Sequence, residues 1–242
     1  METQAPWLER LWQGLLDLLF PPRCVACRWP GSWLCPACLS GVGRVEGPVC
    51  ERCGRPLLRS GLCPSCRAGG LALDCVRAPF FFEGALQRAV HELKYRGRRV
   101  FAEPLGELLA AYLASLGWPV STIVPVPLHP RRERSRGYNQ AALMARVVAG
   151  RLGWPVLERG LTRVRDTRPQ VGLDREARLE NVAWAFRWEG SDPPGRVVLL
   201  DDVYTTGATM EACARTLRQA GVGEVRGVAL ARPRFDPPGR IP

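Results

Sequence analysis

The chain has 242 residues, enough for one or two domains with a sizeable core. Its 46% apolar content excludes an intrinsically disordered protein, and its net charge of +11 favours a polyanionic partner over a cationic one. Lys94 is the only lysine among 34 basic residues. Codon usage accounts for the choice of arginine over lysine but not for the excess of cations over anions.

Apolar residues recur at helical spacing between residues 4 and 20, which predicts an amphipathic N-terminal helix. Pro21 and Pro22 end it, so we expect a first unit over residues 1–22. Charged residues interrupt the helix too often for it to span a bilayer, and no export signal precedes it. We therefore expect a cytoplasmic protein. The apolar stripe either makes peripheral contact with a membrane or, as its mixed polar face favours, docks on the rest of the chain or on a partner.

Eight of the ten cysteines form four CxxC pairs near the N-terminus. The pairs are Cys24/Cys27, Cys35/Cys38, Cys50/Cys53 and Cys63/Cys66. Without an export signal, such pairs indicate metal ligands rather than disulfides. Each pair supplies half of a tetrahedral Cys₄ site, so residues 23–67 are predicted to form a module with two zinc sites. Consecutive pairs share a site in the simplest arrangement, and a crossed arrangement remains open.

The composition around these cysteines provides few side chains for a core, so zinc must supply the folding free energy, on the order of 10–16 kcal/mol per site. A redox role is disfavoured because no thioredoxin-like βαβ pattern surrounds the pairs. A purely structural zinc ribbon and a ribbon that binds nucleic acid are equally compatible with the pattern.

A second domain is predicted over residues 78–242, after a linker at residues 67–78. Helices are predicted at residues 85–95, 101–116, 138–152 and 206–220, and strands at residues 80–82, 122–126, 197–200 and 225–231. Helices alternating with short apolar strands indicate an α/β fold with a parallel sheet flanked by helices. Ligands of such sheets bind at the carboxyl ends of the strands, so the loops after residues 126 and 200 are expected to face one cleft.

The first of these loops, residues 125–140, is strongly basic. It contains Arg131, Arg132, Arg134 and Arg136. Positive charges this close together repel one another unless an anion or a carboxylate neutralises them. A contact with pyrophosphate or nucleic acid is favoured over a solvated basic loop. Tyr138 and Asn139 offer a stacking face and an amide to such a ligand, or else serve as a packing residue and a helix cap.

Residues 163–182 form a long polar segment that includes a proline and a glycine. Such a segment in an α/β protein is typical of a lid over a binding site. A surface helix with charge pairs is the alternative.

Residues 197–210 read VVLLDDVYTTGATM: a buried strand, two acids, a small-residue turn and the start of a helix. Backbone amides at such a turn attract phosphate, whereas the acid pair suits hydroxyls or a divalent ion. A sugar phosphate matches both parts of the motif, because its phosphate suits the turn and its hydroxyls suit the acid pair. An ordinary βα turn with capping threonines is the disfavoured alternative.

This stretch resembles the phosphoribosyl-pyrophosphate (PRPP) motif of type I phosphoribosyltransferases. The resemblance implies that Asp201 and Asp202 bind the ribose hydroxyls. It also implies that the 5′-phosphate is bound by Thr205, Thr206, Gly207, Ala208 and Thr209. A catalytic member would use Mg²⁺ with PRPP.

Four features together resemble the ComF family of competence-associated proteins over residues 15–232. They are the four CxxC pairs, LHPRRERSRGYNQ, RVRDTRPQVGLDREARLENV and VVLLDDVYTTGATM. Lys94 in HELKYRG matches a Lys-Tyr element of the family and joins the arginines as a pyrophosphate or nucleic-acid contact. The resemblance implies a type I phosphoribosyltransferase-like domain behind a Cys₄ module, a cytoplasmic location and the handling of single-stranded DNA during natural transformation.

One position departs from the wider superfamily. Hypoxanthine-guanine enzymes carry a third aspartate, three residues after the acid pair, that exchanges a proton with the purine. Thr205 stands there, and a hydroxyl is a poor general base. Adenine-type relatives lack this aspartate, so Thr205 excludes only the hypoxanthine-guanine subclass.

Three functions follow from these features. The favoured one is a competence protein that binds single-stranded DNA, through arginines and aromatics such as Tyr138, Trp29 and Trp33, and keeps a PRPP pocket. The second is an active phosphoribosyltransferase on a nucleobase or related acceptor. The third is a scaffold that recruits a competence helicase or translocase through the N-terminal helix.

Overall fold

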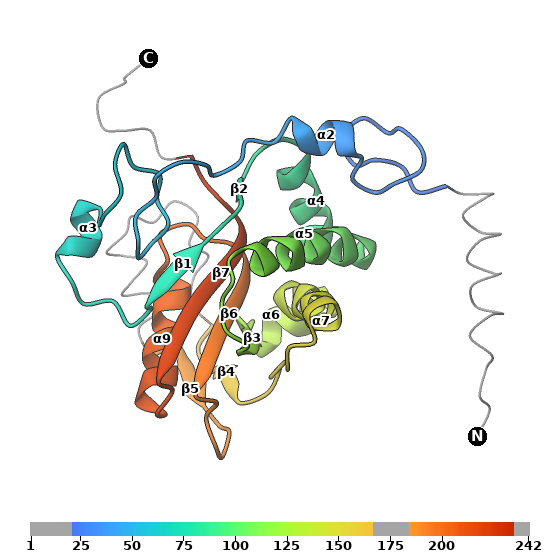
Figure 1. The fold of residues 1–242 in the computed structure, drawn as a ribbon. Helices are drawn as coiled ribbons and strands as arrows, with labels where there is room; N and C mark the ends of the chain where they lie inside the picture. Colours follow the sequence, from blue (N-terminus) through green and yellow to red (C-terminus); the bar gives the residue numbers. More distant parts are fainter. Residues whose placement is uncertain (1–20, 167–183, 235–242) are drawn as a thin grey trace, which may run out of the picture.

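A sheet of five parallel strands forms the centre of the computed structural model, which describes residues 21–166 and 184–234 (Figure 1). The strands are β1 (Cys75–Arg77), β2 (Phe80–Phe81), β3 (Thr122–Pro125), β6 (Arg196–Val203) and β7 (Glu224–Arg232). They follow the order β1-β7-β6-β3, with β2 also pairing with β7. The inner strands β6 and β7 are apolar and buried on both faces, as the run at residues 197–200 predicts.

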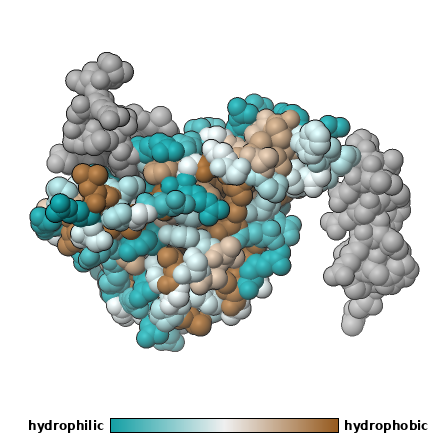
Figure 2. All heavy atoms as spheres, turned by 45° about the horizontal axis from the view of Figure 1, so that its top comes forward, coloured by the Kyte–Doolittle hydropathy of each residue, from teal (hydrophilic) through white to brown (hydrophobic). Residues whose placement is uncertain are grey.

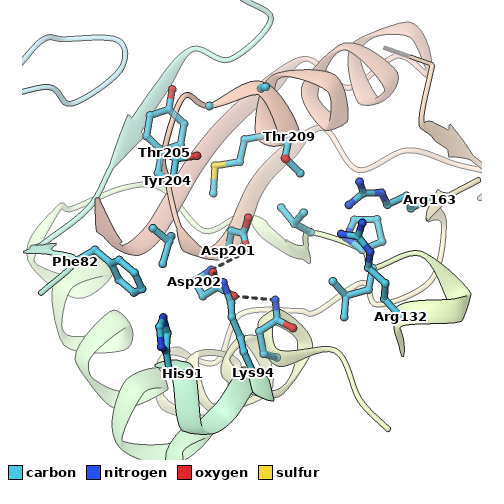
Figure 3. Close-up of a pocket in the computed structure, with 18 of the residues that line it drawn as sticks. Phe82, His91, Lys94, Arg132, Arg163, Asp201, Asp202, Tyr204, Thr205 and Thr209 are labelled. Atoms are coloured by element: carbon cyan, nitrogen blue, oxygen red, sulfur yellow. Dashed lines mark hydrogen bonds and ion pairs between the residues drawn. The ribbon is translucent and has the colours of Figure 1, made fainter. Parts of the chain in front are cut away.

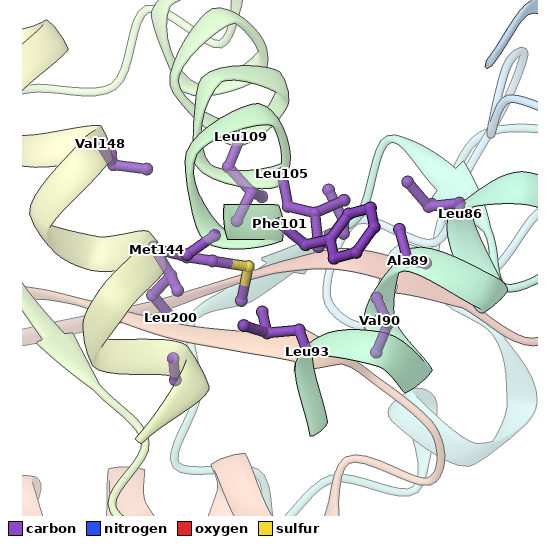
Figure 4. Close-up of a cluster of buried hydrophobic side chains, with 14 of the residues drawn as sticks. Leu86, Ala89, Val90, Leu93, Phe101, Leu105, Leu109, Met144, Val148 and Leu200 are labelled. Carbon is purple, nitrogen blue, oxygen red and sulfur yellow. The ribbon is translucent and has the colours of Figure 1, made fainter. Parts of the chain in front are cut away.

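Helices cover both faces of the sheet (Figure 1). One face carries α4 (Gly84–Tyr95), the 3₁₀ turn η1 (Arg99–Phe101), α5 (Ala102–Ser115) and α7 (Gln140–Leu152), and the other carries α9 (Ala208–Gln219). The larger core lies under the first group, where Phe101, Leu105 and Met144 are fully buried (Figure 4). Helices α5 and α7 approach closely at Gly106, where a Cβ would lie 2.6 Å from Cβ of Val147.

The cysteine-rich module attaches to the sheet domain at two separate places. Its first half, with α2 (Pro36–Ser40), packs through Trp33 against Phe101, with ring centroids 5.9 Å apart. Its second half, with α3 (Pro64–Arg67), contacts the opposite side, where the Cys53 carbonyl accepts a hydrogen bond from Arg232 at 3.0 Å. The two halves therefore rest on different parts of the same domain.

Three short elements lie outside the main sheet. Helix α6 (Pro130–Arg136) follows β3, and a separate antiparallel pair is formed by β4 (Leu161–Arg163) and β5 (Phe186–Trp188). His129 is the N-cap of α6, and its Nδ1 accepts a hydrogen bond from the Arg131 amide at 3.3 Å. Gly137, with φ of +80°, ends it.

The predicted fold class, a parallel sheet flanked by helices behind a Cys₄ module, is confirmed. The linker predicted at residues 67–78 is wrong in part, since β1 lies within it and pairs with β7. The basic loop contains α6, which we did not predict. The predicted helix at residues 4–20 and most of the segment at 163–182 lie outside the described residues. Within the described residues, no helix has both the length and the apolar character to cross a membrane.

Candidate functional site

A cavity of about 420 Å³ opens at the carboxyl ends of β3 and β6 (Figure 3). Parallel pairing in register, with Pro125 beside Leu200, brings the basic segment and the acid pair to this edge together. Val126, Pro127, Leu128 and Arg132 line it from one side, and residues 201–205 and 207–210 line it from another. Because the sequence predicts a sugar-phosphate ligand at this edge, we call it the sugar-phosphate pocket below.

Two carboxylates form the floor of this pocket. Asp202 is 2% exposed; its Oδ1 lies 2.6 Å from Nζ of Lys94, and its Oδ2 accepts a hydrogen bond from Nε2 of Gln140 at 2.7 Å. Asp201 is half-buried and accepts a hydrogen bond from the Asp202 amide at 2.8 Å. Asp202 is thus tied to α4 and α7, whereas Asp201 faces the cavity.

The charges of these side chains influence one another. Burial, together with the neighbouring Asp202 charge, raises the pKa of Asp201 to about 7, and Lys94 opposes the shift. Burial would lower the pKa of Lys94, but Asp202 and Asp201 outweigh it, so that pKa is raised. Lys94 therefore remains a cation at neutral pH, whereas the pKa of Asp201 lies close to neutral.

The turn predicted to hold a phosphate joins β6 to α9. Gly207, at the N-cap of α9, has a φ of +84°, and the ring of Tyr204 leaves no room for a Cβ at this position. Thr205, Gly207, Ala208 and Thr209 line the pocket. Thr206 does not; its Oγ1 accepts a hydrogen bond from the Ala208 amide at 3.5 Å, and it lines a second cavity behind the turn. Of the five expected loop positions, four therefore line the sugar-phosphate pocket, and Thr206 lines only the second cavity.

Arginines occupy one end of the pocket. Arg132 comes from α6 and Arg163 from β4, and Figure 3 shows their guanidinium groups close together. Burial lowers the pKa of Arg163, as does the charge of Arg132. Asp166 neutralises part of this positive charge, since its carboxylate oxygens lie 3.6 Å from Arg132 and 3.7 Å from Arg131. Arg131 and Arg134 are exposed on α6 beside this end.

Three residues of the basic segment are engaged within the protein. Tyr138 is buried, its hydroxyl donates to the Leu93 carbonyl, and Arg99 covers its ring at 4.8 Å. Asn139 caps α7, accepting from the Ala141 amide at 2.9 Å. The packing and capping alternative therefore describes Tyr138 and Asn139 in this structure, and their contact with a ligand stays a prediction. Arg136 donates to Gln140 and lies over Tyr95 at 5.8 Å.

Sequence reasoning missed several residues of the pocket. Gln140 fixes Asp202, Arg163 joins Arg132, and Phe82 with His91 forms the wall opposite the arginines (Figure 3). A signal existed for His91, because it lies three residues before Lys94 and so falls on the same face of a predicted helix. Arg163 and Phe82 carried no such signal.

The cysteines form two clusters that fit zinc. The first cluster is Cys24, Cys27, Cys35 and Cys38, and the second is Cys50, Cys53, Cys63 and Cys66. Sγ of Cys27 and Cys35 are 3.6 Å apart, and Sγ of Cys53 and Cys63 are 3.7 Å apart. A tetrahedral site with Zn–S bonds of about 2.3 Å requires about 3.8 Å. Consecutive pairs therefore share a site, and the crossed arrangement is excluded.

A pH-dependent gain in stability is expected for Asp201→Asn. The folded pKa of Asp201, about 7, exceeds its ordinary value of 3.8, so the native state binds more protons between these values. Stability contributed by this group is therefore present at acidic pH and is lost as the pH rises through 7. Asparagine removes the buried charge, so the variant should melt a few degrees above the wild type at pH 8 and show a smaller difference at pH 5.5.

Thermal unfolding of both proteins at the two pH values measures this effect. Asp192→Asn, at an exposed loop position, is the matched control and should leave the melting temperature unchanged at both. An Asp201→Asn variant whose advantage is the same at pH 5.5 and pH 8 would contradict the raised pKa.

Comparison with known proteins bears on both parts of the chain. Residues 15–67 match the model of the double zinc ribbon domain. DNA utilization protein YhgH of Salmonella typhi is 32% identical over 225 residues, which cover 89% of this chain and 99% of that protein. Competence protein F of Haemophilus influenzae is 31% identical, covering 87% and 96%. Competence protein ComFC of Bacillus subtilis is 26% identical, covering 79% and 80%.

Among solved structures, adenine phosphoribosyl transferase from Trypanosoma brucei overlaps 68% of this chain and 78% of its own. The identity is 14% and the TM-score is 0.35.

Proposed function

Because this chain belongs to the ComF family of competence proteins, which includes DNA utilization protein YhgH, we propose that it acts in the cytoplasm on single-stranded DNA and binds PRPP or a similar sugar phosphate. One observation supports the proposed binding of a sugar phosphate. The sugar-phosphate pocket places an acid pair between a phosphate-type turn and two arginines, in one cavity. A ribose with anionic groups at both ends matches this alternation of charge.

The residues take the following roles in this proposal. Asp201 and Asp202 bind the ribose hydroxyls, and the turn at residues 205–209 binds the 5′-phosphate through its amides and the start of α9. Arg132 and Arg163 contact the pyrophosphate. Lys94 balances the charge of Asp202 and keeps the acid pair from repelling an incoming anion. Mg²⁺ would accompany the pyrophosphate and neutralise part of its charge.

The DNA half of the proposal is supported by the exposed basic surface beside the pocket. Arg131 and Arg134 project from α6, with the side chain of Arg131 75% exposed. Tyr95, which is 69% exposed, lines the pocket, and the guanidinium of Arg136 at the end of α6 lies 5.8 Å from its ring centre. Arginines that track phosphates beside an exposed ring are typical of binding to single strands. Tyr138 and the half-buried Trp33 are less available for stacking than Tyr95.

Binding of an unstructured oligonucleotide should weaken steeply with salt. For a protein that neutralises about four phosphates, the logarithm of the affinity falls with a slope of about −3 against the logarithm of salt concentration. Arg131→Ser with Arg134→Ser should lower both the affinity and this slope in fluorescence anisotropy. Arg196→Ser, at the opposite end of β6, is the control and should change neither. An absence of binding by the wild type at low salt would remove DNA from the proposal.

An active, Mg²⁺-dependent phosphoribosyltransferase is the second candidate. The acid pair, four positions of the turn and two arginines line one cavity, which favours this candidate because each part of PRPP then has a matching group. Release of pyrophosphate from PRPP in a screen of nucleobases tests for turnover. If PRPP binds and no acceptor releases pyrophosphate, the pocket serves as a ligand site alone.

A scaffold for a helicase or translocase would rely on residues 4–20, which lie outside the described part of the chain. On the face shown in Figure 2, the described surface is mainly hydrophilic and its apolar patches are small and separate. Removing residues 1–20 and measuring retention of a candidate partner tests this role independently of the pocket.

A further inference from the structure

The second cavity, behind the turn at residues 205–209, has a volume of about 300 Å³ and lies against the second half of the cysteine-rich module. Apolar side chains of Leu71, Leu73 and Val76 line one part of it. Four arginines also line it: Arg52, Arg55, Arg215 and Arg232. Small molecules bind in protein cavities of about 300–1,000 Å³, so this cavity is large enough for a small ligand. The proposed function makes no use of it.

The arginines of this cavity outnumber its negative charges. Among the described residues that line it, the one acid is Glu211, whose carboxylate accepts hydrogen bonds from the Ala72 amide at 2.6 Å and the Leu73 amide at 3.4 Å. Three cysteines of the second cluster also line it, and a Zn²⁺ ion with four thiolates carries a formal charge of about −2. The four guanidinium groups exceed these charges by one. The cavity therefore attracts an anion even when zinc is bound.

Tyr204 offers a hydrogen-bond donor to the same cavity. The residue is 8% exposed, its hydroxyl lies beside Gly207, and Figure 3 shows its side chain directed away from the acid pair. Within residues 21–166 and 184–234 this hydroxyl makes no hydrogen bond. Buried polar groups in proteins are nearly always paired, so an unpaired phenol in a cavity indicates a missing acceptor.

A phosphate group fits these donors. Arginine forks pair with tetrahedral oxyanions, and charge-assisted hydrogen bonds of this kind are stronger than those between neutral groups. Thr206 adds a hydroxyl, since it lines the second cavity and uses its Oγ1 as an acceptor for the Ala208 amide, which leaves its proton available. The apolar side chains opposite suit the organic part of a phosphate ester.

We infer that the second cavity is a binding site for a small phosphomonoester, separate from the sugar-phosphate pocket. The arginines and the Tyr204 and Thr206 hydroxyls bind the phosphate, and the organic group packs against Leu73 and Val76. Tyr204, Thr205 and Gly207 line both cavities, so a ligand of the second cavity contacts the turn from the side opposite to the sugar phosphate. The inference is independent of the proposed function, which ribose 5-phosphate binding tests.

Calorimetric titration with inorganic phosphate and with butyl phosphate tests this site. The wild type should bind butyl phosphate about tenfold more tightly, since burial of two methylene groups contributes about that factor. Arg52→Met with Arg55→Met should weaken both ligands at least tenfold and keep two zinc ions per chain. Arg59→Met with Arg67→Met is the matched control. It removes the same charge from exposed positions of the same half-module that line neither cavity, and it should change the affinities no more than about twofold.

Tyr204→Phe tests the site without a change of charge or packing. It keeps the ring and removes a hydroxyl without a partner, so the melting temperature should not change. Phosphate should bind about tenfold more weakly, because a hydrogen bond to a charged group contributes about that factor. This variant decides the matter even if the arginine double variant does not fold.

Arg132→Met separates the two cavities, since Arg132 lines the sugar-phosphate pocket and not the second cavity. Phosphate binding that this variant retains and Tyr204→Phe weakens belongs to the second cavity. The inference is wrong if the wild type binds neither anion, if both arginine double variants lose affinity equally, or if Arg132→Met alone abolishes binding.

Discussion

Cys66→Ser is expected to remove one of two zinc ions and to weaken ribose 5-phosphate binding about tenfold or more, a loss of about 1.4 kcal/mol. Cys66 belongs to the second cysteine cluster and does not line the sugar-phosphate pocket. Loss of a ligand removes zinc binding free energy, which is on the order of 10–16 kcal/mol at a structural site, and so unfolds that half of the module. The effect on the pocket then depends on the contacts between the cluster and the phosphate turn.

Those contacts are direct. The Cys53 carbonyl accepts a hydrogen bond from Arg232 at 3.0 Å, and Arg232 is 1% exposed. The Arg232 guanidinium lies 5.8 Å from the centre of the Tyr204 ring, and Tyr204 packs against Gly207 in the phosphate turn. An unfolded second cluster would leave Arg232 buried without this acceptor and Tyr204 without its support. The turn would then lose the geometry that presents its amides.

Zinc content, thermal unfolding and ribose 5-phosphate titration together measure this prediction. Cys38→Ser is the matched control, because it removes the same ligand type from the first cluster, which packs on η1 instead. It should also lower the zinc content to one ion, yet change sugar-phosphate affinity by no more than about twofold, since sites without shared contacts behave independently. Equal losses of affinity in the two variants would show that the second cluster does not specifically support the turn.

Asp202→Ala should abolish ribose 5-phosphate binding and also destabilise the protein by about 3–5 kcal/mol. Asp202 is buried and pairs with both Lys94 and Gln140, so its removal leaves an ammonium group in the interior without its counter-ion. The same substitution should abolish any release of pyrophosphate while leaving oligonucleotide binding largely intact, because the exposed arginines of α6 remain.

Loss of folding is separated from loss of function by a second variant. Lys94→Met with Asp202→Leu replaces the buried pair by apolar side chains, which is often neutral for stability. It should recover most of the melting temperature and still fail to bind ribose 5-phosphate. Asp192→Ala, at the exposed loop, should keep both properties. A folded double variant that binds ribose 5-phosphate normally would falsify the assignment of the acid pair.

The elements that the sequence predicted correctly share one property: their signal is local and repeated. The apolar run at residues 197–200 lies within β6, and the periodic segments at residues 85–95 and 138–152 correspond closely to α4 and α7. The four CxxC pairs carry their chemistry in their own spacing. The prediction of two zinc sites needed no knowledge of the rest of the fold.

The elements that were missed depend on partners distant in the chain. Strand β1 has three residues and exists through its pairing with β7, about 150 positions later. Strands β4 and β5 are equally short and stabilise one another. Helix α6 lies in a segment whose prolines and charges favoured a loop; a histidine cap and a terminal glycine delimit the helix instead.

By itself, the sequence determined the zinc ligands, the acid pair and the turn after β6, because each is a contiguous motif whose backbone geometry follows from its own residues. Tertiary structure alone decided what surrounds them. It buried Tyr138 and Asn139, and it placed Thr206 in the lining of a second cavity. It also brought Gln140, Arg163, Phe82 and His91 to the pocket of the acid pair. The physical reason is that these side chains reach the pocket from separate elements, whose packing rather than local sequence brings them together.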